Sequence, residues 1–451
     1  MPKINRRNFI KLSSATAALT ATPSIIRAQE ASSFEARVIV VGGGFAGATA
    51  AKYLRLWGQG KIHVTLVDKN PNHVSCVLSN LILNDRLQID DITLPYTPLE
   101  DNYGVIVEQG LVTSVTGSSV KTVELNGGTK NLTCDYVVLA PGIEFIDIPG
   151  LKDENGNNFD TIPHAWISGE RTNSGQGQTQ TELLREQLHA MPNNGNGVFV
   201  MTVPQSPYRC PPGPYERACV VADYLKNNKG GGTVYVLDPH ADITIERETF
   251  KSAFEGLYAD IIIYVPNAEL IEVKASSRTA ITSEGTFSGD VLNVIPTHKA
   301  GKIVETLGLT VGNWAPVDVR SYESTISDKS GFYIIGDSNN SGQPKSGHMA
   351  NAQAKVCADA IIRTIASKSS STNLVNDANR LANLKTNSAC YSPITYDEAS
   401  WLSAVFAYDT TKNAMTLVSE SFGSSNEPHW SNDNFEDMFE WSRSLFSNTF
   451  R

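Results

Sequence analysis

Residues 37–56, RVIVVGGGFAGATAAKYLRL, decide the fold, because they join a short apolar run to an alanine-rich run through a cluster of glycines. Gly42, Gly44 and Gly47 have the spacing G-x-G-x-x-G, which permits a tight turn and lets a pyrophosphate approach the first turn of the following helix. A second apolar run, HVTLVD, ends about twenty residues later at Asp68, where a carboxylate can accept a hydrogen bond from a ribose. The stretch therefore predicts a strand, a glycine loop and a helix that together bind a dinucleotide.

Short apolar runs of the same kind alternate with longer helical patterns along the rest of the chain. They read DYVVLA, GVFVMTV, TVYVLD, DVLNVIP and GFYIIGD. Continuous apolar runs of roughly four to seven residues are typical of parallel strands that are buried on both faces. Because 451 residues can form two or three domains, we predict an α/β protein with two Rossmann-like dinucleotide-binding domains and a C-terminal α+β domain.

Two later segments indicate that the dinucleotide is FAD. DYVVLAPG ends in a small-residue turn at Gly142, and GFYIIGD ends at Asp337. In flavoproteins with two dinucleotide-binding domains, such segments return the chain to the flavin, and the acid meets the ribityl chain or a water that bridges to phosphate. Asp337 also fits a second interpretation, in which it caps the helix that follows. The predicted FAD-binding residues are, besides the glycines and the acid of the first motif, Gly142 and Asp337.

The second dinucleotide-binding domain lacks a phosphate loop. After GVFVMTV, where a second glycine motif would belong, residues 204–217 read PQSPYRCPPGPYER. NAD(P)H is therefore not expected as the electron donor. Polar, glycine- or serine-rich stretches mark the predicted domain boundaries. They divide the chain into FAD-binding residues 35–150, a second domain at 151–290, a return to the FAD-binding domain at 291–370, and a C-terminal interface domain at 371–451.

The N-terminal residues have the pattern of a twin-arginine export signal. Arg6 and Arg7 precede Phe9, an alanine- and threonine-rich run follows, and a small residue suited to cleavage stands at Ala28. A basic tail is the alternative interpretation. We expect residues 1–28 to be a signal peptide and the mature protein, folded around its cofactor before export, to work in the periplasm.

Charge and composition exclude several classes of partner. The chain has 37 basic and 47 acidic residues, and removal of the five basic residues before Ala28 leaves 32 against 47, a net charge of −15. An acidic protein is not expected to bind nucleic acid. No run reaches the roughly 18 apolar residues that span a bilayer, so no transmembrane segment is expected in the mature chain. No metal site is predicted, and the absence of C-x-x-C-H means that any c-type haem must belong to another polypeptide.

From these motifs the chain is identified as resembling the flavoprotein subunit of flavocytochrome c sulfide dehydrogenase, which is related to glutathione reductase and sulfide:quinone reductase. The resemblance runs over essentially the whole mature length. It is carried by VVGGGFAGATAAKYLRL, VSCVLSN (74–80), APGIEF, PHAW (163–166), YRCPPGPYERA and PKSGHMANAQAKV (344–356). It implies a glutathione reductase-like fold, a small sulfur substrate and electron transfer to a separate c-type cytochrome subunit.

The resemblance also implies a covalent cofactor. In the family, the cysteine of the C-x-L-S-N segment carries FAD as a thioether at the flavin 8α position, and Cys76 matches that cysteine. On its own, a cysteine beyond the second strand of such a fold is usually a small buried apolar residue.

Cys210 matches the family's redox cysteine, which pairs with a second cysteine two residues after the Gly-Asp of the later flavin strand. Asn339 occupies that second position, so Cys210 lacks the family's partner. Three alternatives stay open: Cys210 pairs with Cys219 or Cys357, it acts alone with a pKa lowered by a helix N-terminus, or it only packs behind the prolines.

Glu216 is the second catalytic candidate, because the family places a glutamate near the sulfur site, where a desolvated carboxyl can exchange protons. A first-turn glutamate that complements the helix dipole, or pairs with Arg217, is the alternative. Lys345 could complement the charge of a reduced flavin or lie in a solvated loop.

The expected function is a periplasmic FAD-dependent sulfide dehydrogenase. The C-terminal aromatic residues, in HWSNDNFEDMFEWSRSLFSNTF, are expected in the core or at a partner surface and not on a membrane. Two alternatives are a membrane-associated sulfide:quinone reductase and a catalytically silent flavin protein that docks a cytochrome.

Overall fold

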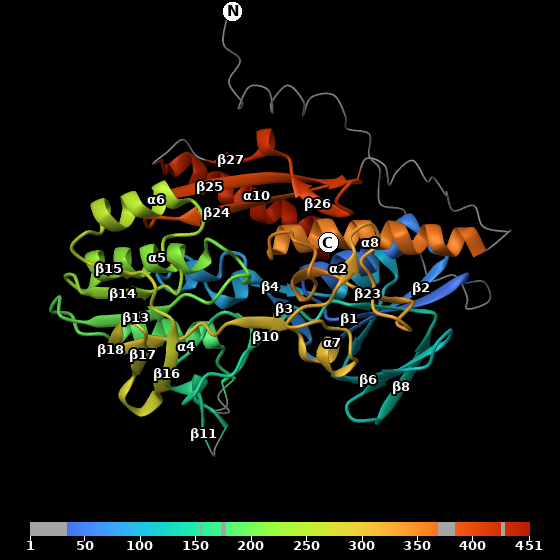
Figure 1. Cartoon of the computed structure of the whole chain (residues 1–451), viewed down its shortest axis with the longest axis horizontal. Helices are drawn as coiled ribbons and strands as arrows, with labels where there is room; N and C mark the ends of the chain where they lie inside the picture. Colours follow the sequence, from blue (N-terminus) through green and yellow to red (C-terminus); the bar gives the residue numbers. More distant parts are fainter. Residues whose placement is uncertain (1–33, 154–155, 173–176, 369–383, 425–428) are drawn as a thin grey trace, which may run out of the picture.

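The computed structural model of the chain describes residues 34–153, 156–172, 177–368, 384–424 and 429–451. The predicted export signal, residues 1–28, lies outside these ranges. Two sheets built mainly of parallel strands lie side by side, and an antiparallel C-terminal sheet lies across both (Figure 1).

The first sheet holds the glycine motif. Its strand order is β21-β22-β23-β9-β1-β2-β5, with β1 parallel to both β2 and β9. Every residue of β1 except Arg37 is buried, as the continuous apolar run predicts for a central parallel strand. The strands span β1 Ala36–Val41, β2 Ile62–Asp68, β5 Ile106–Gln109, β9 Tyr136–Leu139, β21 Val317–Asp318, β22 Glu323–Ser324 and β23 Phe332–Ile334.

The glycine loop joins β1 to helix α2 (Phe45–Trp57), which packs against helix α8 (Gly347–Lys368). Gly42 has a φ of 98° and a side chain there would meet the carbonyl of Ala140 at 2.3 Å. A side chain at Gly47 would meet the Gly42 carbonyl oxygen at 1.8 Å. Both positions therefore require glycine because backbone approaches backbone, which confirms the predicted strand, loop and helix.

The second sheet has the order β15-β14-β13-β19 and is parallel throughout. It contains the runs predicted as GVFVMTV, TVYVLD and DVLNVIP. Its strands are β13 Val198–Thr202, β14 Thr233–Leu237, β15 Ile262–Val265 and β19 Val291–Asn293, and its helices are α4 Gln180–His189, α5 Gly213–Asn228 and α6 Arg247–Ser252. Helix α5 follows β13 and packs against β14, so the YRCPPGPYER segment leads from the sheet into this helix.

The C-terminal sheet consists of β24 Lys385–Pro393, β25 Ala399–Asp409, β26 Ala414–Leu417 and β27 Gly423–Ser424. Strand β24 contacts both α5 and α8, so this sheet bridges the two parallel sheets. Helix α10 (Asn432–Phe450) packs on α2 and buries Phe435, Phe446 and Phe450. These aromatic residues lie in the core, one of the two locations expected for them.

The remaining elements are hairpins, small sheets and short helices around the two parallel sheets. They are β3 Asn72–Val74, β4 Thr93–Pro95, α3 Thr97–Tyr103, β6 Val112–Thr116, β7 Lys121–Leu125, β8 Lys130–Cys134, β10 Ile143–Phe145, β11 Lys152–Asp153, β12 Gly156–Asn157, β16 Leu270–Lys274, β17 Thr279–Thr282, β18 Gly285–Ser288, β20 His298–Ala300 and α7 Lys302–Thr306. Short 3-10 helices η1 (Ser79–Ile82) and η6 (Gly336–Ser338) adjoin the candidate site. Within the described ranges, none of the helices combines the length and the apolar character needed to cross a membrane.

The observed architecture confirms the predicted fold class. It is a glutathione reductase-like α/β fold with two Rossmann-like parallel sheets, and its C-terminal part is an antiparallel β domain completed by α10.

Candidate active site

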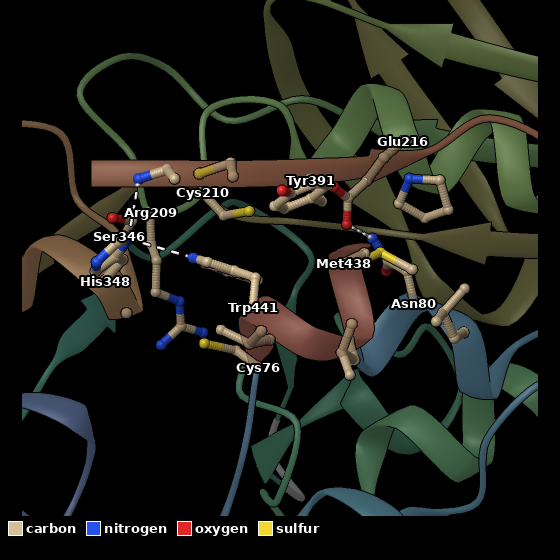
Figure 2. Close-up of a pocket in the computed structure, with 17 residues that line it drawn as sticks. Cys76, Asn80, Arg209, Cys210, Glu216, Ser346, His348, Tyr391, Met438 and Trp441 are labelled. Carbon is tan, nitrogen blue, oxygen red and sulfur yellow. Dashed lines mark hydrogen bonds between the residues drawn. The ribbon is translucent and has the colours of Figure 1, made fainter. Parts of the chain in front are cut away.

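A pocket lies where the two parallel sheets and the C-terminal sheet meet, and five chain segments line it (Figure 2). Its cavity volume of about 50 Å³ holds only a few water-sized molecules, since one water needs about 10–15 Å³ on this scale. The lining residues are Cys76, Val77, Leu78, Asn80 and Leu81 from the segment after β3; Arg209, Cys210 and Glu216 around the start of α5; Ser346, Gly347 and His348 at the start of α8; Ala389, Cys390, Tyr391 and Pro393 from β24; and Met438 and Trp441 from α10.

The YRCPPGPYER segment holds Cys210 in a strained turn. Cys210 has a φ of 57°, a left-handed conformation that non-glycine residues rarely adopt. Its N–H donates to the Lys345 carbonyl at 2.7 Å, and its own carbonyl accepts from the Gly213 N–H at 2.9 Å. A side chain at Gly213 would lie 3.0 Å from the Cys210 Sγ, so this glycine leaves room for the thiol. The prolines and glycine therefore fix a thiol at the pocket wall.

The electrostatic surroundings of Cys210 do not favour a thiolate. Burial raises its pKa well above the usual value, and the neighbouring charges of Glu216, Cys390 and Cys76 raise it further, while Arg209 acts in the opposite direction. This direction is opposite to the lowered pKa hypothesised from the α5 N-terminus, and burial is its largest cause.

Glu216 lines the same pocket, so the fold brings Cys210 and Glu216 together (Figure 2). Burial raises the pKa of Glu216 to about 8, and the charge of Glu246 adds to that effect. The Asn80 Nδ2 donates to the Glu216 Oε1 at 2.6 Å and partly stabilises the ionised form. At neutral pH the carboxyl is mostly protonated, so it can donate a proton to a group in the pocket.

Arg217 does not pair with Glu216 through a hydrogen bond of its own. Its Nε donates to the Asn80 Oδ1 at 2.9 Å, so Asn80 bridges the two side chains. The guanidinium also stacks over the Trp166 ring at 5.0 Å. The suggested ion pair with Arg217 is thus replaced by an amide bridge, and this bridge orients Glu216.

Asn339 is a structural residue that does not line the pocket. Its buried side chain donates to the carbonyls of Ile334 and Gly336 and to the Gln353 Oε1, at 3.3, 2.9 and 2.7 Å. Its Oδ1 accepts from the Ser341 N–H at 3.1 Å. The position that resembles the family's second cysteine therefore fixes the loop after β23 by hydrogen bonds.

The two cysteines considered as partners of Cys210 lie elsewhere. Cys219 is completely buried in the core around the second sheet, and Cys357 is completely buried in the core between α2 and α8. Neither lines the pocket. The pocket instead contains Cys390, which the sequence analysis did not select. The sequence shows Cys390 only as a cysteine in the predicted C-terminal domain. No glycine or proline motif around it marks it as a site residue.

Cys76 lies between the glycine loop and the pocket. It lies just after β3, in the connection to the antiparallel strand β4, and His73 of β3 lies 3.6 Å from the position that a side chain on Gly44 would occupy. Burial raises the pKa of the Cys76 thiol, while the charge of Arg209 lowers it and that of Asp337 raises it. Arg209 is a further residue that the sequence analysis missed, although it adjoins Cys210; its N–H donates to the His298 Nδ1 at 3.0 Å.

Polar groups around the glycine loop fit FAD. The buried Asp337 Oδ1 has no hydrogen-bond partner among the described residues, as expected of an acceptor that would meet a ribityl hydroxyl. Helix α2 has neither a side-chain cap nor an acidic residue in its first turn, so its positive end suits a pyrophosphate. A side chain on Gly142 would meet no atom within 4 Å, which leaves open space at this predicted position.

Two predicted residues brace the site by hydrogen bonds. Asp68 accepts from the N–H groups of Gly43 and Asn70, at 2.6 and 2.7 Å, and so supports the glycine loop; a contact with a ribose stays a prediction. The Lys345 ammonium is buried and donates to the carbonyls of Asp337 and Asn339 at 2.8 and 2.7 Å. Burial lowers the pKa of Lys345 to about 8, so the solvated-loop interpretation of Lys345 is wrong.

In comparisons with known proteins, the first and the second dinucleotide-binding domains match two different family models. Residues 36–171 match the pyridine nucleotide-disulphide oxidoreductase family, and residues 181–296 match the central part of the flavoprotein chain of sulfide dehydrogenase (flavocytochrome c). The chain is 52% identical over 46 residues to the sulfide dehydrogenase flavoprotein chain of Chlorobaculum thiosulfatiphilum, which is 10% of this chain and 94% of that sequence.

Two further relatives place the chain more broadly. It is 28% identical over 156 residues to the demethylphylloquinone reductase of Synechocystis, covering 33% of this chain and only 38% of that protein. The solved sulfide:quinone oxidoreductase of Aquifex aeolicus superposes with a TM-score of 0.67 over 92% of each chain at 16% identity, which supports the fold alone.

The pH dependence of stability tests the state of Glu216. In the folded protein its pKa is about 8 against an ordinary 4.5, so the folded state binds the proton more tightly and wild-type stability falls as pH rises between these values. The glutamine of Glu216→Gln does not titrate, so the variant does not share this loss. The free energy of unfolding of Glu216→Gln minus that of wild type should therefore rise from pH 4.5 to 8 and stay constant above pH 8. Urea denaturation across this range measures the difference.

The exposed Glu436 provides the matched control. Glu436→Gln makes the same chemical change at an exposed position on α10 and shows the effect of the substitution itself. A pH-independent stability difference between Glu216→Gln and wild type would contradict the protonated Glu216.

Proposed function

The chain belongs to the family of the flavoprotein chains of flavocytochrome c sulfide dehydrogenase, and we propose that it oxidises sulfide and passes the electrons to a separate c-type cytochrome. The observation that carries the proposal is the small pocket that places the thiol of Cys210 and the carboxyl of Glu216 beside Cys76. A cavity of about 50 Å³ has room for hydrosulfide.

Each pocket residue has a separate role in this proposal. Cys210 provides the sulfur atom at which substrate sulfur is bound, and its strained turn keeps that atom at the wall. Glu216, held by Asn80, donates a proton to a thiolate or accepts one from hydrogen sulfide. Arg209 offers a positive charge beside Cys76 and Cys210, which favours entry of an anion such as hydrosulfide.

FAD, held by the glycine loop and Asp337, would supply a two-electron acceptor. We propose that Cys76 carries it as a thioether, as the family resemblance implies. Two features support this attachment: Cys76 comes directly after strand β3, whose His73 adjoins the glycine loop, and its side chain is directed to the pocket wall next to Arg209 (Figure 2). A covalent cofactor also suits the proposed twin-arginine export to the periplasm, where lost FAD could not be replaced.

The electron acceptor is proposed to be a c-type cytochrome and the donor is not NAD(P)H. The chain has no C-x-x-C-H sequence, so a haem of this type would have to come from a partner. Helix α5 begins with Pro212 as its cap and has Glu216 in its first turn, where a dinucleotide phosphate would need glycines and no acid. This first turn supports the absence of a nicotinamide site.

Sulfide:quinone reductase activity is the second candidate, supported by the shared fold with the Aquifex aeolicus enzyme. Against it, α10 uses Phe435, Phe446 and Phe450 to pack the core, so these side chains are not available for a bilayer surface. The third candidate is a catalytically silent flavin protein that docks a cytochrome.

Attachment of FAD to Cys76 can be measured directly. After acid precipitation of the purified protein, we expect the flavin absorbance to stay with the pellet and the peptide that contains VSCVLSN to gain the mass of FAD. Cys76→Ser should bind FAD that acid releases, because the glycine loop is intact. An unmodified Cys76 peptide from fully flavin-loaded protein would contradict the attachment.

The reaction is tested by steady-state assays with two acceptors. Sulfide should support reduction of a c-type cytochrome at a rate at least tenfold above that of a short-chain ubiquinone analogue, and Cys210→Ser should lose at least 90% of it. Cys219→Ser is the matched control, since it removes a buried thiol outside the pocket. Faster reduction of the quinone would favour the second candidate, and no flavin reduction by sulfide would favour the third.

A further inference from the structure

Glu246 carries a second buried carboxyl, which does not line the pocket. Glu246 directly precedes helix α6 and has a φ of 47°, a left-handed conformation that non-glycine residues rarely adopt. Its side chain makes no capping hydrogen bond to the helix. The backbone at Glu246 is therefore strained although the carboxyl does not serve its own helix, so the reason for this conformation lies in what the carboxyl contacts elsewhere.

Two serine hydroxyls of the C-terminal sheet bind this carboxyl. The Ser392 Oγ donates to the Glu246 Oε2 at 2.9 Å, and the Ser400 Oγ donates to the Glu246 Oε1 at 2.7 Å. The two serines are paired in the register of β24 and β25, and both are completely buried. The paired strands thus offer one donor to each oxygen of Glu246, and such donors favour the ionised form of a carboxyl.

Strand β24, which carries Ser392, also forms one wall of the pocket. Ser392 lies between Tyr391 and Pro393, which line the pocket together with Glu216. Helix α5, which carries Glu216, packs on β24. The carboxyls of Glu216 and Glu246 therefore come from different elements and adjoin the same strand.

Among the described residues, Glu246 takes part in no ion pair. The adjacent Arg247 is exposed and contacts Asp242 and Glu248. The charge of Glu246 instead acts on three groups of the neighbouring elements, and it raises the pKa of each. They are Glu216 and Cys219 on α5 and Cys390 on β24.

The two carboxyls differ in how readily they ionise. Burial raises the pKa of Glu246 to about 7, although both serine hydroxyls act in the opposite direction. Burial raises the pKa of Glu216 to about 8, and the charge of Glu246 contributes more to this rise than Arg217 takes away. Glu246 therefore ionises first as pH rises, and its charge then makes loss of the proton from Glu216 more costly. By linkage, an ionised Glu216 acts equally on Glu246.

We propose that Glu246 is a positioning residue that holds the proton on Glu216, because the negative charge of the pair resides on Glu246 between the two serines. Near neutral pH, where an isolated glutamate is ionised, the pair therefore keeps a proton at the pocket. The effect on turnover rests on the proposed function, whereas the coupling of the two carboxyls does not.

The coupling is tested by infrared titration of the full-length, flavin-loaded protein. The C=O absorption of protonated carboxyls is followed in wild type, Glu216→Gln, Glu246→Gln and the double variant, which provides the baseline without either group. Wild type should lose two protons in two steps, the upper one at about pH 8. Each single variant should show one step, at least about 0.5 pH unit below that upper step, because the like charge is absent. A wild-type curve equal to the sum of the two single-variant curves would overturn the proposal.

Two further variants check that the effect comes from the carboxyl held by the serines. Glu248→Gln makes the same chemical change at an exposed glutamate of α6 and should leave both steps in place. Ser400→Ala keeps both carboxyls but removes one donor to Glu246, so the lower step should move to higher pH. An unmoved lower step in Ser400→Ala would contradict the ionisation of Glu246 between the serines.

The pH profile of sulfide oxidation separates the coupling from the function. If Glu216 exchanges the proton during turnover, Glu246→Gln should move the corresponding step of the profile to lower pH, by the same shift that the infrared titration shows. If the infrared step moves and the turnover profile does not, the coupling stands and the proposed role of Glu216 in sulfide oxidation fails.

Discussion

The buried guanidinium of Arg217 is the interaction on which the site depends. Only 2% of Arg217 is exposed, and its donors reach the Asn80 Oδ1, the carbonyls of His164 and Ala165, and the Asn293 Oδ1 at 2.6–3.0 Å. A buried charge is tolerated only when such partners satisfy it. The first domain, the segment before α4 and strand β19 must therefore assemble around α5 together, and this assembly places Glu216 and Cys210 at the pocket.

The same assembly explains the chemistry of the pocket. The Asn80 Oδ1 accepts a hydrogen bond from Arg217, and this orients the Asn80 Nδ2 so that it donates to Glu216. The carboxyl and the thiols lie in surroundings that penalise negative charge, so burial raises the pKa of both kinds of group and they are mostly protonated at neutral pH. A mostly protonated pocket beside the positive Arg209 is compatible with a small anionic substrate such as hydrosulfide.

Local motifs made the fold and part of the site predictable. The glycine spacing and the continuous apolar runs fix strands and helices through short-range geometry. The odd composition of YRCPPGPYER drew attention to Cys210, and the family resemblance implied Glu216. Cys390 could not be found in the same way, because tertiary contacts of β24 with α5, α8 and α10 bring it to the pocket. The structural role of Asn339 could not be predicted from the sequence either, because its hydrogen bonds to Gln353 and to two carbonyls form only in the folded loop. Cys219 was suggested by proximity in sequence, but the core of the second domain buries it.

The most direct test of sulfide chemistry in this pocket is anomalous diffraction from a crystal of the flavin-loaded protein soaked anaerobically in hydroselenide, a heavier analogue of hydrosulfide. The account predicts one selenium atom bonded to a cysteine sulfur inside the pocket, within reach of Glu216. Selenium bound only at the surface, or absent from a pocket whose flavin has nevertheless been reduced, would contradict it.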